Sequence, residues 1–147
     1  EREGITVTAK EYLGQVETLN RRIKQAEEQI RNIKIMATSA GAIRYDKDIV
    51  QSTPTNDSFA NYMIRLEKAE AKYRNLIMRL LDLRMKIEDQ LRNLMPGLYA
   101  DVLYMRWIEC KKLEVVADEL NYSYEYMRQV HGRALQAFAR KYLDDNC

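Results

Sequence analysis

The sequence contains few of the residues that interrupt helices. Among its 147 residues there are 5 glycines and 2 prolines, whereas Asp, Glu, Lys and Arg together make up 31%. This composition suits long, solvated helices better than a compact sandwich or barrel of short strands. We therefore expect an all-α fold.

The chain is also poor in residues that bind metals or perform catalysis. Its only cysteines are Cys110 and Cys147, and its only histidine, His131, has no Cys, Asp or second His at ligand spacing. These residues allow neither a disulfide framework nor a CxxC metal pair, and the common catalytic motifs are missing. We expect no metal, no cofactor and no enzymatic activity. We expect His131 to pack against a helix or to contact a phosphate.

Long apolar runs and a strong excess of one charge are missing as well. No apolar run reaches the ~18 residues that a membrane span needs, so we expect no membrane partner. The scarcity of cysteine favours a reducing, cytoplasmic setting. The formal net charge is only +2. Any binding of nucleic acid would therefore have to come from a local basic surface.

Apolar residues recur at alternating spacings of four and three through most of residues 1–95. This heptad pattern predicts a helical coiled-coil arm, in which Thr8 and Glu11 form a capping box at the start. A connector is expected near residues 38–58, where Gly41, Pro54 and a polar cluster break the pattern. The two helices could fold back as an antiparallel pair or join a second chain, and we expect a homo-oligomer. The heptad residues are Tyr12, Val16, Leu19, Ile23, Ala26, Ile30, Ile33 and Ala37, then Phe59, Met63, Leu66, Tyr73, Ile77, Leu80, Ile87, Leu91 and Leu94.

Three shorter helices are predicted after Pro96-Gly97, where we place a domain boundary. They cover about residues 98–110, 113–120 and 124–143, with a sharp turn at Asn121-Tyr122 and Ser123 as the cap of the third helix. This order is typical of helix-turn-helix DNA-binding domains, so residues 96–147 are predicted to form one. Ala117 is small enough to let the second and third helices cross closely. The residues expected to face inward are Trp107, Leu113, Val116, Ala117, Leu120, Met127, Val130, Ala134, Leu135 and Phe138.

Two sets of residues carry a resemblance to known families. The segments Leu113–Ala117, Asn121–Ser123 and Met127–Val130, with Glu125 and Arg133-Ala134-Leu135, resemble region 4 of primary bacterial sigma factors over about 45 residues. The whole chain also resembles small phage and prophage proteins that are described as sigma-factor-like or as late-gene transcriptional regulators of the RinA and ArpU type. The stretches that carry this second likeness are 9–13, 49–52, 101–106 and 122–124.

The resemblance implies a sigma-region-4-like DNA-binding domain and a role in a bacterial host cell, with RNA polymerase as a further expected partner. Tyr124 stands where sigma factors usually have a basic residue, and Val115 stands where an acidic one is common. The part of a sigma factor that melts promoter DNA is missing. The chain is therefore not expected to act as a full primary sigma factor or to share the sigma consensus site.

The first turns of the third helix would present side chains that can read base edges. Tyr124, Glu125, Arg128 and Gln129 share one helix face, and Arg, Gln and Glu can pair with guanine, adenine and cytosine, respectively. By resemblance to sigma region 4, Glu125, Arg128 and Gln129 occupy base-contacting positions. Glu125 has an alternative role, in which its charge interacts favourably with the dipole of the helix. The residues expected to contact phosphate are Lys111, Lys112, Ser123 and Arg133.

The function expected from these features is sequence-specific binding of double-stranded DNA by a transcription regulator of phage or prophage origin. Two alternatives remain open from the sequence. One is a DNA-packaging recognition subunit in the manner of small terminases, which also combine a helix-turn-helix with helical oligomerisation. The other is a protein–protein adaptor whose helix-turn-helix no longer binds DNA.

Overall fold

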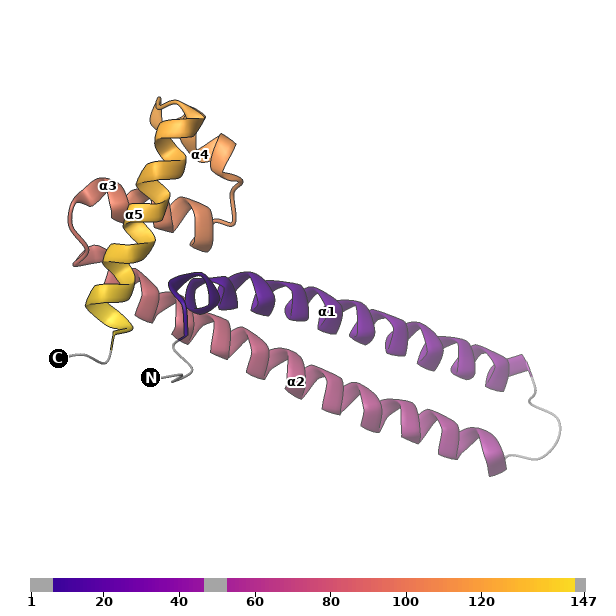
Figure 1. Ribbon diagram of the computed structural model, residues 1–147. Helices are drawn as coiled ribbons and strands as arrows, with labels where there is room; N and C mark the ends of the chain where they lie inside the picture. Colours follow the sequence, from indigo (N-terminus) through magenta and orange to yellow (C-terminus); the bar gives the residue numbers. More distant parts are fainter. Residues whose placement is uncertain (1–6, 47–52, 145–147) are drawn as a thin grey trace. The chain divides into compact units, whose positions relative to one another are not determined.

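The structure, a computed structural model, describes the backbone of residues 7–46 and 53–144 and the side chains of residues 7–39 and 58–144. The described residues form only helices and the turns between them, so the all-α prediction is confirmed. Contacts divide the chain into two compact units, Glu1–Thr18 with Leu80–Cys147, and Leu19–Arg79. The elements are α1 (Ala9–Asp46), α2 (Thr53–Arg92), α3 (Gly97–Leu103), the π-helical segment η1 (Tyr104–Ile108), α4 (Leu113–Leu120) and α5 (Tyr124–Tyr142) (Figure 1).

Helix α1 begins with the predicted capping box. The Thr8 backbone N–H donates to Glu11 Oε2 at 3.3 Å, and the Glu11 backbone N–H donates to Thr8 Oγ1 at 3.2 Å. Each side chain thus satisfies a backbone donor that the first helical turn leaves without a partner. The start of the helix predicted from these two residues is confirmed.

The predicted connector near residues 38–58 is largely helical. Helix α1 continues through Gly41 to Asp46, and α2 already begins at Thr53. A glycine inside a helix costs only about 1 kcal/mol, and Pro54 falls in the first turn of α2, where its missing N–H costs no hydrogen bond. Residues 47–52, which include the whole resembling stretch 49–52, lie outside the described residues, as does Cys147.

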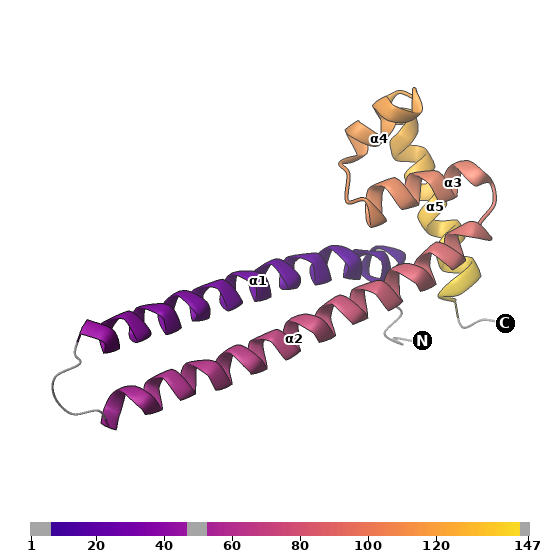
Figure 2. The ribbon, with the colours of Figure 1, turned by 180° about the vertical axis from the view of Figure 1, so that it is seen from behind.

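In the unit Leu19–Arg79, α1 and α2 run side by side in opposite directions, as both views show (Figures 1 and 2). The Tyr73 hydroxyl of α2 donates to Glu27 Oε1 of α1 at 3.0 Å. Among the described residues of this unit, the buried side chains are three alanines and two leucines, namely Leu19, Ala26, Ala37, Ala69 and Leu76.

The predicted apolar series of α2 does not coincide with the residues that the unit buries. Phe59 is 39% exposed and Met63 is 44% exposed, whereas Ala69 and Leu76, which are outside that series, are buried. The apolar stripe of α2 is wider than one heptad seam, so the spacing alone could not decide which part of it faces α1. Phe59 and Met63, which keep the predicted heptad spacing, are therefore exposed in this chain taken alone.

The other unit contains two apolar clusters. In the first, Leu13 and Val16 of α1 and Ile87 and Leu91 of α2 pack with Phe138 of α5 and its neighbours. In the second, α3, α4 and α5 meet around Val102, Val116, Ala117, Met127 and Val130. The residues of α4 and α5 predicted to face inward are buried or half-buried there, and those predictions are confirmed.

Polar contacts also connect the end of α2 to α5. The Tyr142 hydroxyl donates to the Gln90 carbonyl oxygen at 2.6 Å, and the Lys141 ammonium group donates to the Asn93 carbonyl oxygen. The Tyr12 hydroxyl donates to Gln90 Oε1 at 2.9 Å. The compact unit that holds α5 therefore includes the first turns of α1 and the last turns of α2, in addition to residues 96–147.

The helix predicted over residues 98–110 has two parts. Helix α3 ends at Leu103, and the π-helical segment η1 follows, closed by the Glu109 N–H donating to the Tyr104 carbonyl at 3.0 Å. The wider turn leaves both Trp107 and Ile108 in the apolar cluster with α5. Trp107 is only 8% exposed, as predicted for a core residue.

Candidate nucleic-acid interface

The turn between α4 and α5 has a defined hydrogen-bonding pattern. Asn121 takes the left-handed conformation with φ 62°, which Asn tolerates better than most residues. The Tyr122 N–H donates to the Ala117 carbonyl at 2.9 Å, and the Asn121 N–H donates to the Asp118 carbonyl at 3.2 Å. These two bonds form a Schellman motif, which ends α4 and redirects the chain within two residues. The turn predicted at Asn121-Tyr122 is confirmed.

Ser123 begins α5 as its N-cap residue, as predicted. It has an extended backbone, and its Oγ accepts a hydrogen bond from the Tyr126 backbone N–H at 3.2 Å. The cap fixes the first turn of α5, which carries two of the predicted base-contacting residues. The local geometry of the interface therefore depends on this one side chain.

Replacing Ser123 with Ala should destabilise the chain by about 1 kcal/mol, because the Tyr126 N–H loses its acceptor. Chemical denaturation of the wild type and of Ser123→Ala and Ser123→Asp measures this effect. Asp also caps helices well, so Ser123→Asp should retain most of the stability. Equal destabilisation by both variants would contradict the capping role.

Helices α4 and α5 contact each other closely through small and apolar side chains. Ala117 is 1% exposed and packs in the cluster that contains Met127 and Val130 of α5. A larger residue at position 117 is expected to push the two helices apart, because added volume in a packed apolar cluster usually causes strain. The close packing fixes the orientation of α5 and therefore decides which of its residues stay in solvent.

The four predicted base-contacting residues, Tyr124, Glu125, Arg128 and Gln129, all lie exposed on the first turns of α5. Three of them, Glu125, Arg128 and Gln129, line one shallow depression of about 430 Å³. The Arg128 Cζ atom lies 5.9 Å from the centre of the Tyr124 ring, and within the described residues Arg128 forms no ion pair. The structure thus brings together a phenol, a carboxylate, a guanidinium and an amide on one exposed face.

Of the residues expected to contact phosphate, some are exposed and one already forms ion pairs within the chain. Lys112 and Arg133 are exposed, as is Ser123 at the cap. Lys111 instead pairs with Glu109 at 2.7 Å and with Glu119 at 2.9 Å. Hydrogen bonds to these two carboxylates raise the pKa of Lys111 above its usual value. The sequence could not reveal this, because Glu109 and Glu119 reach Lys111 only after the segment from η1 to α4 has folded.

Two further tyrosines, to which the sequence assigned no binding role, are exposed beside the predicted base-contacting residues. Tyr122 and Tyr126 are 43% and 41% exposed, and their ring centres are 5.1 Å apart. Tyr122 directly precedes the N-cap and Tyr126 lies in the first turn of α5, and a ring before the N-cap can pack against the first turns of the helix, so these positions could have indicated the pair. They widen the exposed face at the N-terminal end of α5 with apolar ring surface.

His131 lies on the buried side of α5 and contacts Trp107. The Trp107 indole Nε1–H donates to His131 Nε2 at 3.1 Å, so this nitrogen must be unprotonated. Burial, together with the positive charges of Arg106 and Lys10, lowers the pKa of His131 to about 4, and burial is the largest of these causes. His131 therefore packs against the core, one of its two predicted roles, and does not belong to the exposed face.

No family model matches the chain, and no curated protein or solved structure shows significant similarity to it. Along the described helices, polar and charged residues recur too often for any stretch to serve as a membrane span. The described residues contain no group of three His, Cys, Asp or Glu side chains in a position to hold a metal ion. The functional interpretation therefore depends on the geometry of the α4–α5 region.

Proposed function

We propose that this chain is a sequence-specific double-stranded DNA-binding protein that regulates transcription. The single observation that supports this most directly is the exposed face of Glu125, Arg128 and Gln129 on a helix whose other side is buried. A helix of this kind fits the major groove, where these three side-chain types can distinguish base pairs. In this proposal α4, the turn and α5 act as a helix-turn-helix of the sigma-region-4 type, following the helical pair of α1 and α2.

The proposal includes the wider role that the resemblance implies. The chain would act in the cytoplasm of a bacterial host as a regulator of phage or prophage origin, in contact with RNA polymerase as sigma region 4 is. It would form a homo-oligomer through the helical arm. Exposed apolar side chains on α2, such as Ile64, Met78 and Met85, are compatible with a second chain packing there.

The electrostatics of the DNA-reading part suggest that it binds weakly alone. Residues 96–147 contain seven Lys or Arg and eight Asp or Glu, so their formal charge is −1. From position 121 to 141 the balance is favourable, with four basic residues and Glu125 as the single acidic one. Phosphate contacts dominate the affinity of most DNA-binding proteins. The α5 face would therefore need a second copy or a second basic surface to reach useful affinity.

Selection of bound sequences from a random duplex pool at a stated salt concentration tests the proposal. The wild-type chain should enrich one sequence motif, and the double variant Arg128→Ala, Gln129→Ala should enrich a weaker or different one. A matched variant, Arg140→Ala, lies on α5 away from the first turns and should retain the wild-type motif. A pool with no enriched motif would contradict sequence-specific recognition.

Gly132 lies on the same face of α5, four residues after Arg128 and seven after Glu125. It is exposed, and a Cβ atom added there would meet no heavy atom within 4 Å. Packing within the chain therefore gives no reason for glycine inside this helix, where it costs about 0.5–1 kcal/mol relative to alanine. A close approach of DNA to the α5 backbone would explain why glycine stands at this position.

The variant Gly132→Ala should unfold at higher denaturant concentration, with about 0.5–1 kcal/mol more stability. It should also bind the selected duplex several-fold more weakly, because the added methyl group would meet the DNA. Denaturation and duplex titration of the same preparation measure both effects, with Gln136→Ala as a control one turn further along. Unchanged duplex binding would show that DNA does not approach the helix at Gly132.

A further inference from the structure

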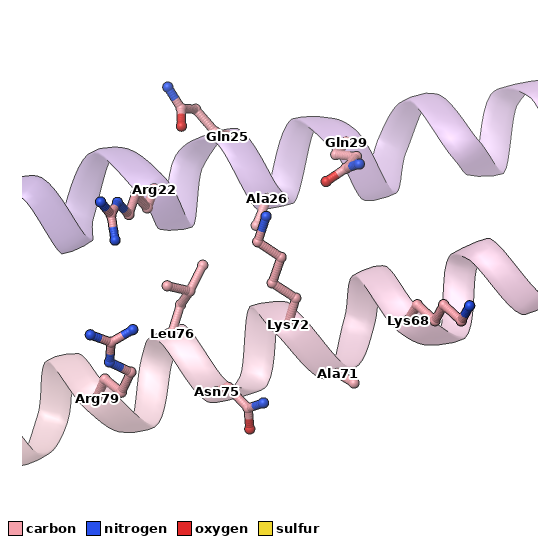
Figure 3. Close-up of a pocket in the computed structure, with 10 residues that line it drawn as sticks. All are labelled: Arg22, Gln25, Ala26, Gln29, Lys68, Ala71, Lys72, Asn75, Leu76 and Arg79. Atoms are coloured by element: carbon pink, nitrogen blue, oxygen red, sulfur yellow. The ribbon is translucent and has the colours of Figure 1, made fainter.

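A groove follows the junction of α1 and α2 within the unit Leu19–Arg79. It has a volume of about 740 Å³, and its floor consists of small or apolar residues, among them Ala26 and Leu76 (Figure 3). Lys72 and Leu76 project from α2 toward α1, while Arg22 and Arg79 lie at one end of the groove and Lys68 at the other. A second groove of about 670 Å³ shares Lys68 and Lys72 and extends to Arg65. The two form one continuous furrow, which we call the basic groove.

The basic groove is lined by a stripe of basic residues on α2 and a stripe of mainly amide residues on α1. Its basic residues on α2 fall at positions i, i+3, i+7 and i+14, so they form one stripe along about 21 Å of helix. They are Arg65, Lys68, Lys72 and Arg79. On α1 the corresponding stripe has the spacing i, i+3, i+7 and i+10 and consists of Arg22, Gln25, Gln29 and Asn32.

Few acidic groups offset these charges. Glu28 is the one carboxylate among the lining residues, and it lies in the second groove. Glu67 and Glu70 lie on α2 at least 140° around the helix from Arg65. Among the described residues, none of the lining Lys and Arg side chains forms an ion pair, and all of them are exposed. Like charges held together without partners cost stability, which a bound polyanion would restore.

The charge of the chain is concentrated in this unit. Residues 19–79 contain twelve Lys or Arg and seven Asp or Glu, so their formal charge is +5, although that of the whole chain is only +2. Residues 96–147, which carry the proposed base-reading face, have a formal charge of −1. The strongest electrostatic attraction for a polyanion therefore comes from the unit Leu19–Arg79.

We infer that the basic groove binds the phosphate backbone of duplex DNA without regard to sequence. The inference builds on the proposed function, which supplies duplex DNA as the ligand and leaves the α5 face short of phosphate contacts. Lysine and arginine contact phosphate oxygens directly, and the amides of Gln25, Gln29 and Asn32 can donate to them. No aromatic ring lines the groove, so it offers no surface on which unpaired bases could stack. This disfavours single-stranded RNA as the ligand.

The test compares two variants of the full chain with equal net charge. The groove variant carries Arg22→Gln, Lys68→Gln, Lys72→Gln and Arg79→Gln. The control variant carries Lys24→Gln, Arg31→Gln, Lys34→Gln and Arg74→Gln, which are exposed and lie outside the lining of the groove. Glutamine is a good helix former, and circular dichroism verifies that both variants retain their helices. Each protein is titrated with a labelled duplex of arbitrary sequence over a range of salt concentrations.

For the groove variant, the slope of log affinity against log salt should fall in magnitude by about 3.6, because four phosphate contacts are lost and each contributes about 0.9. Its affinity at about 0.1 M salt should fall at least tenfold. The control variant should lose much less on both measures. Equal losses in the two variants would overturn the inference, because they would indicate an effect of total charge alone. Failure of the wild type to bind any duplex would overturn it as well.

A labelled single-stranded RNA serves as the second probe. If the groove variant lost RNA binding and retained duplex binding, the assignment to duplex DNA would be wrong. The outcome for the groove is separate from the outcome for α5. An altered salt slope without any motif enriched from the random pool would support the groove and contradict sequence-specific recognition. An enriched motif together with an unchanged salt slope in the groove variant would support sequence-specific recognition by α5 and contradict the role of the groove.

Discussion

Replacing Arg128 with Ala should weaken binding to the preferred duplex by about 1–3 kcal/mol, or roughly 5- to 150-fold, and relax the sequence preference at one base pair. The guanidinium is exposed, forms no ion pair among the described residues and lies beside the Tyr124 ring. It is therefore available to donate two hydrogen bonds to guanine O6 and N7. Binding to unrelated duplexes should change far less, because that binding depends on phosphate contacts.

A second arginine on α5 serves as the control. Arg133 is exposed and is expected to contact phosphate, so Arg133→Ala should weaken specific and unrelated duplexes by a similar factor. Titration of both variants with the preferred duplex, with single-base changes of it and with an unrelated duplex separates the two roles. If Arg128→Ala weakened all duplexes equally, its assignment to a base contact would fail.

Acid should destabilise the wild-type chain through His131. The pKa of His131 is about 4 in the folded chain and near 6.5 in the unfolded chain, so between these values the unfolded chain binds more protons. The stability associated with neutral His131 is complete above pH 6.5 and is lost as the pH falls toward 4. The full shift corresponds to about 3 kcal/mol, and solvent screening of the partly exposed imidazole reduces this to about 1–2 kcal/mol.

Urea denaturation at several pH values measures this effect against the variant His131→Gln. Glutamine does not titrate, and its side-chain oxygen can accept a hydrogen bond from the Trp107 indole. The wild type should lose about 1–2 kcal/mol more than the variant between pH 7 and pH 4.5. A proton NMR titration of the imidazole provides a direct check. A midpoint near 6.5 in the folded chain, or identical pH profiles for the two proteins, would contradict a half-buried, neutral His131.

The features that the sequence predicted well are local. The capping box of Thr8 and Glu11, the cap at Ser123 and the bounds of α4 all follow from contacts between residues a few positions apart. The inward-facing residues of α5 follow from helical periodicity, because only one face of that helix is apolar.

The features that escaped prediction depend on which helix faces meet. The apolar stripe of α2 is wider than one heptad seam, so periodicity could not show that Ala69 and Leu76, rather than Phe59 and Met63, would be buried. The ion pair of Lys111 with Glu119 and the contact between Trp107 and His131 join residues 8 and 24 positions apart, which only the folded chain brings together. The same holds for the basic groove, whose two stripes belong to separate helices.

Interference by methylation at guanine N7 tests the central claim most directly, because that atom lies in the major groove where Arg128 is expected to donate. In a duplex selected by the wild type, methylation of at least one guanine should abolish binding, and the variant Arg128→Ala should be insensitive to methylation at that same guanine. If the variant remained sensitive to every guanine that matters to the wild type, or if no guanine mattered at all, α5 would not read the major groove through Arg128.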